Sequence, residues 1–319
     1  MLTACGQHDK ALHFNGAAQG TYYTVSYYDA ERHNLQPMVD SMLDAFDRSV
    51  SLWVDSSLLR QLNAGVTDSL DEILLSLLDH SLAIERYTDG AFNCRVGRLV
   101  QAWGFSFRQR SEPDSLMLAR MVAAAHAPVS IAGKHLVRTD AATELDFNAI
   151  AQGYSVDLLA AAFEKIGVHD YIIDVGGEVT AHGCKSGGKA WRVGIERPSD
   201  DSVSVPQVMN AIEVRDAAVV TSGSYRKYYE RDGMRYSHTI DPVTGRPVQH
   251  TLLSVTVVDS ACWQADAMAT AYMVMGLEGS LSFIDEHRGQ PGTGAVMFIY
   301  ADGDTLRTYM TPEFKKMTI

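Results

Sequence analysis

Two Asp-Gly pairs constrain the fold of this chain more than any other feature of its sequence. Asp232-Gly233 and Asp302-Gly303 each separate two segments that are rich in β-branched and aromatic residues. Asp-Gly readily supplies the positive φ that a tight hairpin turn needs, so each pair predicts two neighbouring antiparallel strands. By the same composition we expect strands at 21–28, 144–147, 171–175, 191–195, 210–214, 217–221, 224–231, 234–240, 253–258, 296–300 and 305–310.

Helical periodicity predicts helices that cover such sheets. Apolar residues recur at helical spacing in 37–50 and 71–87, and further helices are expected at 152–166 and in the Ala-rich segment 262–275. No internal repeat, low-complexity tract or Pro/Ser-rich linker divides the chain. We therefore predict an α+β fold with mixed, largely antiparallel sheets and packed helices, as a single domain over residues 11–319 with room for two lobes.

The N-terminal residues suggest a lipid anchor. Leu2-Thr3-Ala4-Cys5 followed by the polar residues 6–10 resembles a bacterial lipobox, in which the cysteine carries the lipid. We therefore expect residues 1–10 to form a lipobox-like terminus and tether, although the charged and apolar regions of a signal peptide do not precede it. The alternative is an incidental cysteine. The longest uninterrupted apolar stretches are shorter than the roughly 18–20 residues of a membrane-spanning helix, so we expect contact with the membrane only through the anchor.

The charge balance argues against binding to nucleic acid. The formal net charge is −12, the pI is near 5.3, and Lys and Arg form no basic stripe. Because affinity for nucleic acid depends on clustered basic residues, we expect no nucleic-acid partner. An acidic protein can still bind an anionic nucleotide where a divalent metal or a helix N-terminus supplies positive charge.

One segment comes close to a phosphate-binding loop. Residues 183–190 nearly match the P-loop pattern, but Ala190 replaces the hydroxyl residue that would hold Mg²⁺. The segment that follows predicts a strand instead of the helix which the motif requires. We interpret these residues as a hairpin loop. Cys94, Cys184 and Cys262 are widely spaced, with no neighbouring His at zinc-ligand spacing, so a structural zinc site is not expected either.

A carboxylate, a hydroxyl and an imidazole form the strongest candidate site. Asp266 and Thr270 are four residues apart on the Ala-rich helix and so share one face, where their oxygens suit Mg²⁺. The alternative is a solvated or capping pair. His238 would suit a general base, with a structural histidine as the alternative. Asp241 would either orient His238 or serve as a turn residue before Pro242.

Several separated blocks together resemble the ApbE-type FAD:protein FMN transferases, from about Ala17 to Met310. Each block is short, but all of them occur in the family's order. They are Gln19-Gly-Thr21, Ser51-Leu-Trp53, 56–63, 88–93, Val96-Gly97, Trp103-Gly-Phe105, Leu145-Asp146, 153–157, Val175-Gly-Gly177, Thr221-Ser-Gly223 with Tyr225, Ser237-His238, Asp241-Pro242, Thr244-Gly245, Ala265-Asp-Ala267 and Thr270-Ala271.

The resemblance implies a fold, a site and a reaction. The fold would be ApbE-like, related to the T-fold. Asp266, Thr270 and the carbonyl of Ala149 would hold Mg²⁺, with His238 and Asp266 as catalytic residues. A Thr or Ser hydroxyl of an acceptor protein would attack the FMN-side phosphorus of FAD and expel AMP. The FAD substrate would be bound by Gln19, Trp53, Ala91, Phe92, Asn93, Asp146, Gln152 and Ile240.

For Trp53 and Phe92, burial in the core is the alternative to a role in binding FAD. The family also implies export, a lipid anchor on the bacterial membrane facing the periplasm, and an acceptor that is a subunit of a membrane redox complex. Two other activities fit the same residues. They are a metal-dependent FAD pyrophosphatase, and a non-catalytic FAD-binding lipoprotein.

Three residues depart from the family's pattern. Gln19 stands where Met is common, Gln152 where Lys is frequent, and Ala269 where some relatives have an acidic residue. We expect Gln19 to alter the contacts beside the flavin more than the chemistry. Gln152 removes a positive charge near FAD, and Ala269 removes a third carboxylate ligand of the metal.

Overall fold

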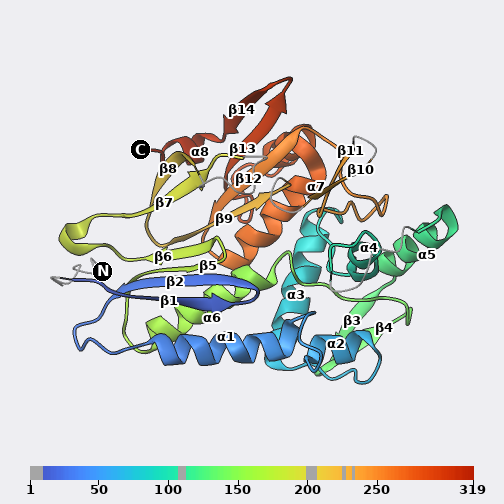
Figure 1. Cartoon of the computed structure of the whole chain (residues 1–319), viewed down its shortest axis with the longest axis horizontal. Coiled ribbons are helices and arrows are strands. Elements are labelled where there is room, and N and C mark those ends of the chain that lie inside the picture. Colours follow the sequence, from blue (N-terminus) through green and yellow to red (C-terminus); the bar gives the residue numbers. More distant parts are fainter. Residues whose placement is uncertain (1–9, 107–112, 199–206, 225–227, 232–233) are drawn as a thin grey trace.

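A single antiparallel sheet of eight strands runs through the protein, in the order β1-β2-β5-β6-β9-β12-β13-β14 (Figure 1). This computed structural model describes residues 10–106, 113–198, 207–224, 228–231 and 234–319. Every neighbouring pair in the sheet is antiparallel, which agrees with the prediction of largely antiparallel sheets. The strands are β1 (Leu12–Ala18), β2 (Thr21–Tyr28), β5 (Asp170–Val175), β6 (Glu178–His182), β9 (Ala217–Gly223), β12 (Leu252–Asp259), β13 (Ala295–Asp302) and β14 (Thr305–Met310).

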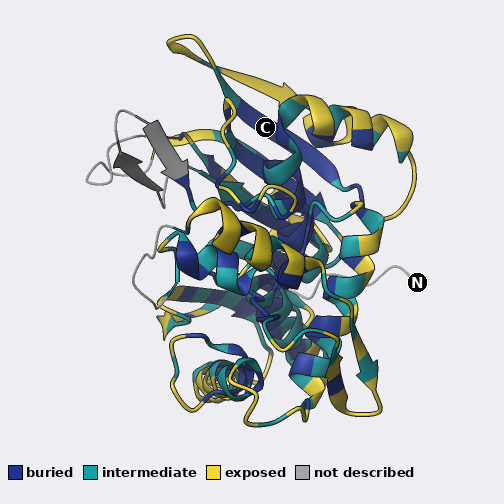
Figure 2. Ribbon diagram, turned by 90° about the vertical axis from the view of Figure 1, so that its right-hand side faces the viewer, coloured by how far each residue is buried: buried dark blue, intermediate teal, exposed yellow. Residues whose placement is uncertain are grey.

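Helices cover one face of this sheet. On that face α6 (Ala151–Lys165) and α7 (Cys262–Glu286) contact the central strands, and α1 (Gln36–Val50) and α3 (Glu72–Tyr87) complete the layer. Their apolar side chains form the largest core with strand residues such as Val175 and Val220. Figure 2 shows the buried residues following the sheet and its inner helices, with exposed residues on the outer helices and hairpin tips.

A small antiparallel sheet covers part of the other face. It consists of β7 (Trp191–Glu196) and β8 (Val208–Val214), which pack with α8 (Pro312–Lys315) in a second core that contains Val219 and Trp191. Residues 183–190 connect β6 to β7 through one 3-10 turn, Ser186–Gly188, and no α-helix follows them. The interpretation as a loop is therefore confirmed.

The remaining described elements form a third, smaller core beside the first. Its residues come from α4 (Gly97–Ala102), α5 (Ser115–His126) and the segment after β11, which contributes Ile240. The other elements are α2 (Leu58–Asn63) and the hairpins β3 (Val129–Ala132) with β4 (His135–Arg138) and β10 (Tyr228–Arg231) with β11 (Met234–Ser237). The second hairpin agrees with the turn predicted at 232–233, residues that lie outside the described ranges.

The prediction of a strand at 144–147 is wrong, and β1 is among the strands that the sequence did not predict. Residues 144–147 form only an isolated bridge at Glu144, because the Leu145 N–H donates to Asn63 Oδ1 (2.8 Å) and the Asp146 N–H to the Cys94 carbonyl (2.7 Å). Conversely, β1 was not expected, since Asn15, Gly16 and two alanines are weak strand formers. Gly16 fits because a Cβ there would lie only 2.5 Å from the Tyr23 ring.

The Ala-rich helix α7 is longer than predicted and ends at Glu286 instead of Met275. It is broken at Gly276, whose φ of 71° few other residues adopt. In the described part of the chain it is the one helix long and apolar enough to cross a membrane, with a mean hydropathy of 1.2. However, α7 contacts β9, β12 and α6, which makes it the central helix of the core.

Candidate active site

The site is built where α6 and α7 cross. The Gly153 N–H in the first turn of α6 donates a hydrogen bond to Asp266 Oδ2 on α7, at 3.0 Å. A Cβ at residue 153 would lie 2.5 Å from the Cys262 carbonyl oxygen and 2.8 Å from Asp266 Cβ. Only glycine permits this close approach, which places the predicted metal ligand Asp266 beside the N-terminus of α6.

Asp157, one turn further along α6, fixes the beginning of α7. Its carboxylate accepts hydrogen bonds from the backbone N–H groups of Cys262 (2.9 Å) and Trp263 (2.8 Å). These are two of the donors that the first turn of a helix leaves without a partner. Burial nevertheless raises the pKa of Asp157 to about 6. Asp157 thereby sets the position of the helix that carries Asp266 and Thr270.

Asp266 is buried and Thr270 partly buried, on the same face of α7 as predicted. Desolvation and, to a smaller extent, the charge of Asp157 raise the pKa of Asp266 to about 7, against the hydrogen bond from Gly153. Thr270 Oγ1 lies 3.5 Å from Ser222 Oγ on β9. This side of the sheet therefore presents a buried carboxylate and two hydroxyls.

The oxygen donors predicted here are of the type that a hard divalent cation prefers. Ala149 precedes α6 by two residues, so its carbonyl belongs to the segment that leads into the crossing. Among the described residues, no group of three His, Cys, Asp or Glu side chains is placed to hold a metal. The predicted set of ligands has one carboxylate, one hydroxyl and one backbone carbonyl, so it is of a different kind. Mg²⁺ commonly takes few protein ligands and completes its coordination with substrate phosphates.

Asp146 has a buried acceptor atom without a hydrogen-bond partner. The residue is buried, Oδ1 accepts the Asn148 N–H at 2.9 Å, and Oδ2 has no hydrogen-bond partner. Desolvation raises the pKa of Asp146 to about 6. A buried acceptor without a partner costs free energy, so Oδ2 is suited to a donor group on a ligand.

Gln19 and Trp53 each lie near the end of α1. Gln19 lies in the β1–β2 turn with a φ of 53°, and its backbone N–H donates to Asp47 in the last turn of α1. The Gln19 Nε2 is buried without a hydrogen-bond partner, whereas Trp53, three residues past α1, is 57% exposed. The alternative of a core aromatic is therefore wrong for Trp53, whose ring is accessible for stacking.

The other residues predicted to contact FAD differ in their burial and in the hydrogen bonds that they already make. Gln152 lies under the β5–β6 turn, with its Nε2 2.2 Å from where a Cβ on Gly176 would be. Phe92 is only 2% exposed and belongs to the main core, so its side chain is structural. Asn93 is likewise engaged, since Nδ2 donates to the Ala125 carbonyl and Oδ1 accepts the Arg95 N–H. Ala91 is partly buried beside them.

Ile240 belongs to the third core, and His238 lies beside it. The His238 ring is 6.4 Å from the Phe105 ring in a T-shaped arrangement, and Ile240 packs with Leu99 and Leu118. Asp241 serves the turn, because Oδ1 accepts the Val243 N–H (2.8 Å) and Oδ2 the Thr244 hydroxyl (2.9 Å). Of its two suggested roles, the structure favours that of a turn residue. Cys5 and Tyr225 lie outside the described residues.

Three residues of this region were not singled out by role from the sequence. Gly153 and Asp157 are four residues apart, so they share a face of α6, which is a readable signal for contact with one partner. Ser222 follows Thr221, the last residue of a predicted strand, but its approach to Thr270 depends on which face the strand turns to α7. That choice is made only by the pairing of β9 with β12.

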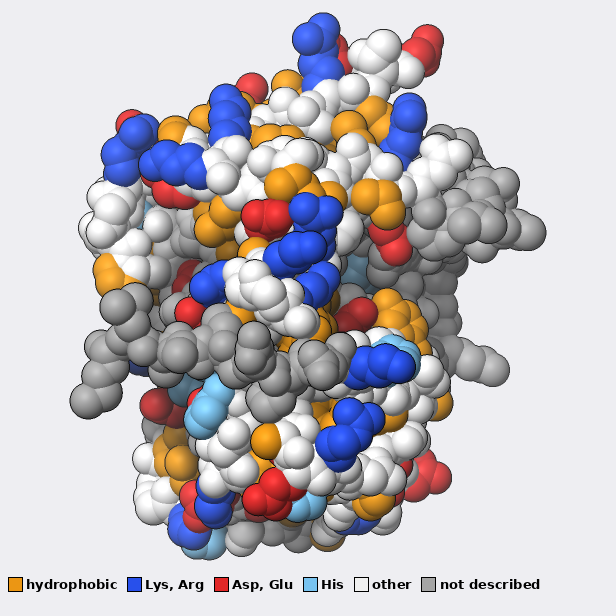
Figure 3. All heavy atoms as spheres, turned by 90° about the vertical axis from the view of Figure 1, so that its left-hand side faces the viewer, with side chains coloured by type: hydrophobic (Ala, Val, Ile, Leu, Met, Phe, Trp, Pro, Cys, Tyr) orange, Lys and Arg blue, Asp and Glu red, His pale blue; other side chains and the backbone are white. Residues whose placement is uncertain are grey.

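Among the described residues of the face that carries β7 and β8, the basic side chains form no continuous surface. Figure 3 shows Lys and Arg grouped near its centre, with Asp and Glu among them. Arg192, for example, pairs with Glu213 at 3.1 Å. The Arg215 guanidinium donates to the Gly188 carbonyl at 2.8 Å. This mixed distribution agrees with the absence of a basic stripe in the sequence.

Comparison with known proteins shows which family the chain is similar to. A model described as the ApbE family matches residues 19–295. An FAD:protein FMN transferase of Vibrio cholerae is 32% identical over 325 residues, which covers 99% of this chain and 95% of that protein. The FAD:protein FMN transferase of Escherichia coli K12 is 33% identical, with 95% and 88% covered.

Solved structures are similar over the same length. The apo form of the flavinyl transferase ApbE of Pseudomonas stutzeri has a TM-score of 0.84 at 31% identity, covering 97% of this chain and 96% of that one. The flavin transferase ApbE of Vibrio cholerae has a TM-score of 0.81 at 31% identity, with 97% and 99% covered.

Proposed function

The chain belongs to the ApbE family, and we propose that it is an FAD:protein FMN transferase that moves FMN from FAD onto a hydroxyl of an acceptor protein. The observation that carries the proposal is the crossing of α6 and α7. It places the buried carboxylate of Asp266 beside Gln152 and Gly153, at the end of the sheet where Gly176 and Ser222 also lie.

We infer that Asp266, Thr270 and the Ala149 carbonyl hold Mg²⁺ together with the phosphates of FAD. Bound there, Mg²⁺ would neutralise negative charge on the pyrophosphate and help to align the reacting groups. What supports the site is its chemistry, since a buried carboxylate without a cationic partner is costly unless a positive charge approaches it. The raised pKa of Asp266 has the same cause.

The FAD would extend from Trp53 to the α6–α7 crossing. Trp53 offers an exposed ring for the isoalloxazine, and the buried Nε2 of Gln19 nearby lacks an acceptor that a flavin can supply. The Gln19 amide therefore adds a hydrogen bond as well as altering the contacts beside the flavin. Asp146 Oδ2 likewise has no hydrogen-bond partner, so a donor group of FAD would satisfy it. Ile240 would line the end nearer His238.

In the reaction, the hydroxyl oxygen of a Thr or Ser forms a bond to the FMN-side phosphorus while the bond from that phosphorus to the AMP oxygen breaks. His238 accepts the hydroxyl proton, and AMP leaves. Holding the hydroxyl and the phosphorus in line supplies most of the catalysis in such phosphoryl transfers, and the base adds a further factor of about 10²–10⁴.

We also propose a location and a kind of acceptor. Cys5 would carry a lipid that anchors the exported protein to the bacterial membrane, facing the periplasm, and a subunit of a membrane redox complex would be the acceptor. The lipobox-like residues 2–5 support the anchor. Incorporation of labelled palmitate into wild-type protein, and its loss in Cys5→Ser, would be the test of this part.

The activity is tested with FAD, Mg²⁺ and a purified domain that contains one Thr. We expect flavin fluorescence on the denatured domain and an equal amount of AMP. His238→Asn should lower the transfer rate by about 10²-fold or more while FAD still binds. AMP and free FMN without a labelled domain would indicate the pyrophosphatase, and bound FAD without either product would indicate a binding protein.

A further inference from the structure

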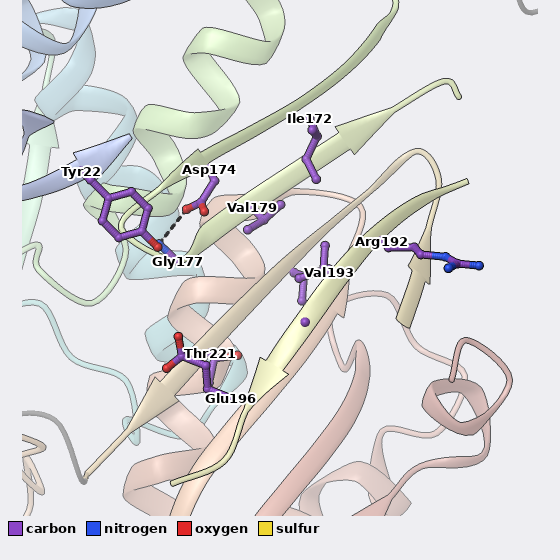
Figure 4. Close-up of a pocket in the computed structure, with 11 residues that line it drawn as sticks. Tyr22, Ile172, Asp174, Gly177, Val179, Arg192, Val193, Glu196 and Thr221 are labelled. Carbon is purple, nitrogen blue, oxygen red and sulfur yellow. Dashed lines mark hydrogen bonds between the residues drawn. The ribbon is translucent and has the colours of Figure 1, made fainter. Parts of the chain in front are cut away.

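A cavity of about 280 Å³ lies on the face of the main sheet opposite α6 and α7 (Figure 4). Its walls come from β2, β5, β6, β7 and β9. Tyr22, Asp174 and Gly177 line one side, Thr221 lines the other, and Val193 and Glu196 of β7 lie across it. The volume is slightly below the range of about 300–1,000 Å³ typical for whole small ligands, so a short peptide segment suits it better than a dinucleotide.

The cavity lies where the sheet divides. The ladder between β6 and β9 contains three residue pairs and ends at Val179 opposite Val219. Beyond that point β9 continues along β12 as far as Gly223, whereas β6 begins at Glu178 after the Gly176-Gly177 turn. The two halves of the sheet therefore separate towards Thr221 and Gly177, which both line the cavity.

At this division, neighbouring residues of the chain face the candidate active site and the cavity, and this holds for both walls of the cavity. Successive side chains of a strand point to opposite faces. Ser222 faces Thr270, and its neighbour Thr221 lines the cavity. On the other wall, Gly176 approaches Gln152, and its neighbour Gly177 lines the cavity. The two spaces thus adjoin the same end of the sheet from opposite faces.

One wall of the cavity comes from β7. In the described part of the chain, β7 pairs with a single strand, β8. Val193 and Gly194 of β7 line the cavity. A strand edge can pair with an added extended peptide through main-chain hydrogen bonds, which require no particular sequence.

We propose that this cavity binds the extended, hydroxyl-bearing segment of the acceptor protein. The inference rests on the proposed function. In a displacement at phosphorus, the attacking and leaving oxygens lie on opposite sides of the phosphorus atom, so the acceptor needs an approach separate from that of the departing AMP. With FAD along the α6–α7 face, the division of the sheet gives the hydroxyl such an approach from the opposite face.

The first test fills the cavity from β7. Val193→Trp should raise the KM for the single-Thr acceptor domain by about tenfold or more, while the Kd for FAD, measured by flavin fluorescence, stays within about twofold of wild type. Met209→Trp is the matched control, because Met209 is an exposed residue of the neighbouring strand β8 and does not line the cavity. It should leave both constants unchanged.

A second test blocks the cavity after folding. In the described part of the chain the free thiols, those of Cys94 and Cys262, are buried. A maleimide applied to folded Val193→Cys should therefore modify the new thiol, and any reaction at Cys5 occurs equally in the wild type. Wild-type protein treated in the same way is the control. We expect the modified variant to lose labelling of the acceptor domain and to keep its affinity for FAD, whereas the unmodified variant retains both.

The outcomes separate this inference from the proposed function. An unchanged KM for the acceptor in both Val193 variants would overturn it. Weaker binding of FAD to the same variants would also overturn it, because the cavity would then belong to the FAD site. If wild-type enzyme labelled no acceptor, the proposed function would fail in that control, before any variant was compared.

Discussion

At the scale of single residues, Gly153 decides how closely α6 and α7 approach. Its missing Cβ leaves room for the Cys262 carbonyl, and its N–H fixes Asp266 Oδ2 at 3.0 Å. The buried Asp266 thereby gains one strong donor and otherwise faces a region of oxygen atoms. The same hydrogen bond limits the rotation of the carboxylate that we assign to the metal.

We predict that Gly153→Ala separates the two helices. The added methyl group should lower the free energy of unfolding by about 2–3 kcal/mol, because backbone atoms cannot yield as a flexible side chain would. Affinity for Mn²⁺, used as a probe for Mg²⁺, should fall as well. Chemical denaturation and metal titration would measure both.

The matched control is Gly279→Ala, later on α7. A Cβ there would meet only Met275 Cβ at 3.3 Å, and alanine favours a helix, so stability should change by about 1 kcal/mol or less. A Gly153→Ala protein as stable as the wild type would show that the crossing tolerates a side chain.

At the scale of elements, the beginning of α7 depends on a side chain of another helix. No side chain of α7 itself caps its N-terminus, and the Asp157 carboxylate of α6 accepts its first N–H groups instead. The carboxylate is also favoured by the positive end of the helix dipole. Positioning of the metal ligands and formation of the helix are therefore linked through one residue.

We predict that Asp157→Ala lowers the free energy of unfolding by about 1–2 kcal/mol, the usual effect of losing a cap, and weakens binding of Mn²⁺. Asp157→Asn, which keeps one acceptor oxygen, should recover part of both. Asp71→Ala is the control, since Asp71 caps α3 through the Leu74 N–H at 2.8 Å, away from the metal ligands. If Asp71→Ala weakened the binding of Mn²⁺ as much as Asp157→Ala does, Asp157 would have no special role in positioning the metal ligands.

At the scale of the whole molecule, the buried carboxyl groups of Asp146 and Asp266 and the partly buried one of Asp157 make stability depend on pH. Desolvation raises the pKa of Asp146 and of Asp157 to about 6 and that of Asp266 to about 7. An ordinary carboxyl group has a pKa near 4. Between these values the folded protein holds protons that the unfolded chain has released, so folding loses stability as pH rises.

We therefore predict that, with EDTA present, the free energy of unfolding falls between pH 4 and pH 7. Each group contributes about 1.4 kcal/mol per unit of its pKa shift, and Asp157→Asn should make the slope shallower. Mg²⁺ with FAD should stabilise the protein more at pH 7.5 than at pH 5, since they favour the ionised carboxylates. Urea denaturation across this range provides the measurement, and stability that rises from pH 4 to 7 would contradict it.

The sequence by itself determined the class of the fold, most elements and the candidate residues. Strand composition and the Asp-Gly turns indicated an antiparallel sheet, and the four-residue spacing placed Asp266 and Thr270 on one helix face, because these depend on local geometry. The ordered motifs indicated the family.

Only the tertiary structure decided how distant segments meet. The position of Asp157 at the start of α7, the contact between Gly153 and Asp266, the exposure of Trp53 and the burial of Phe92 all depend on residues far apart in the chain. The division of the sheet beside Thr221 follows from where the pairing of β6 and β9 ends. Local composition carries little information about such contacts, since they depend on the register of strands and on the crossing of helices.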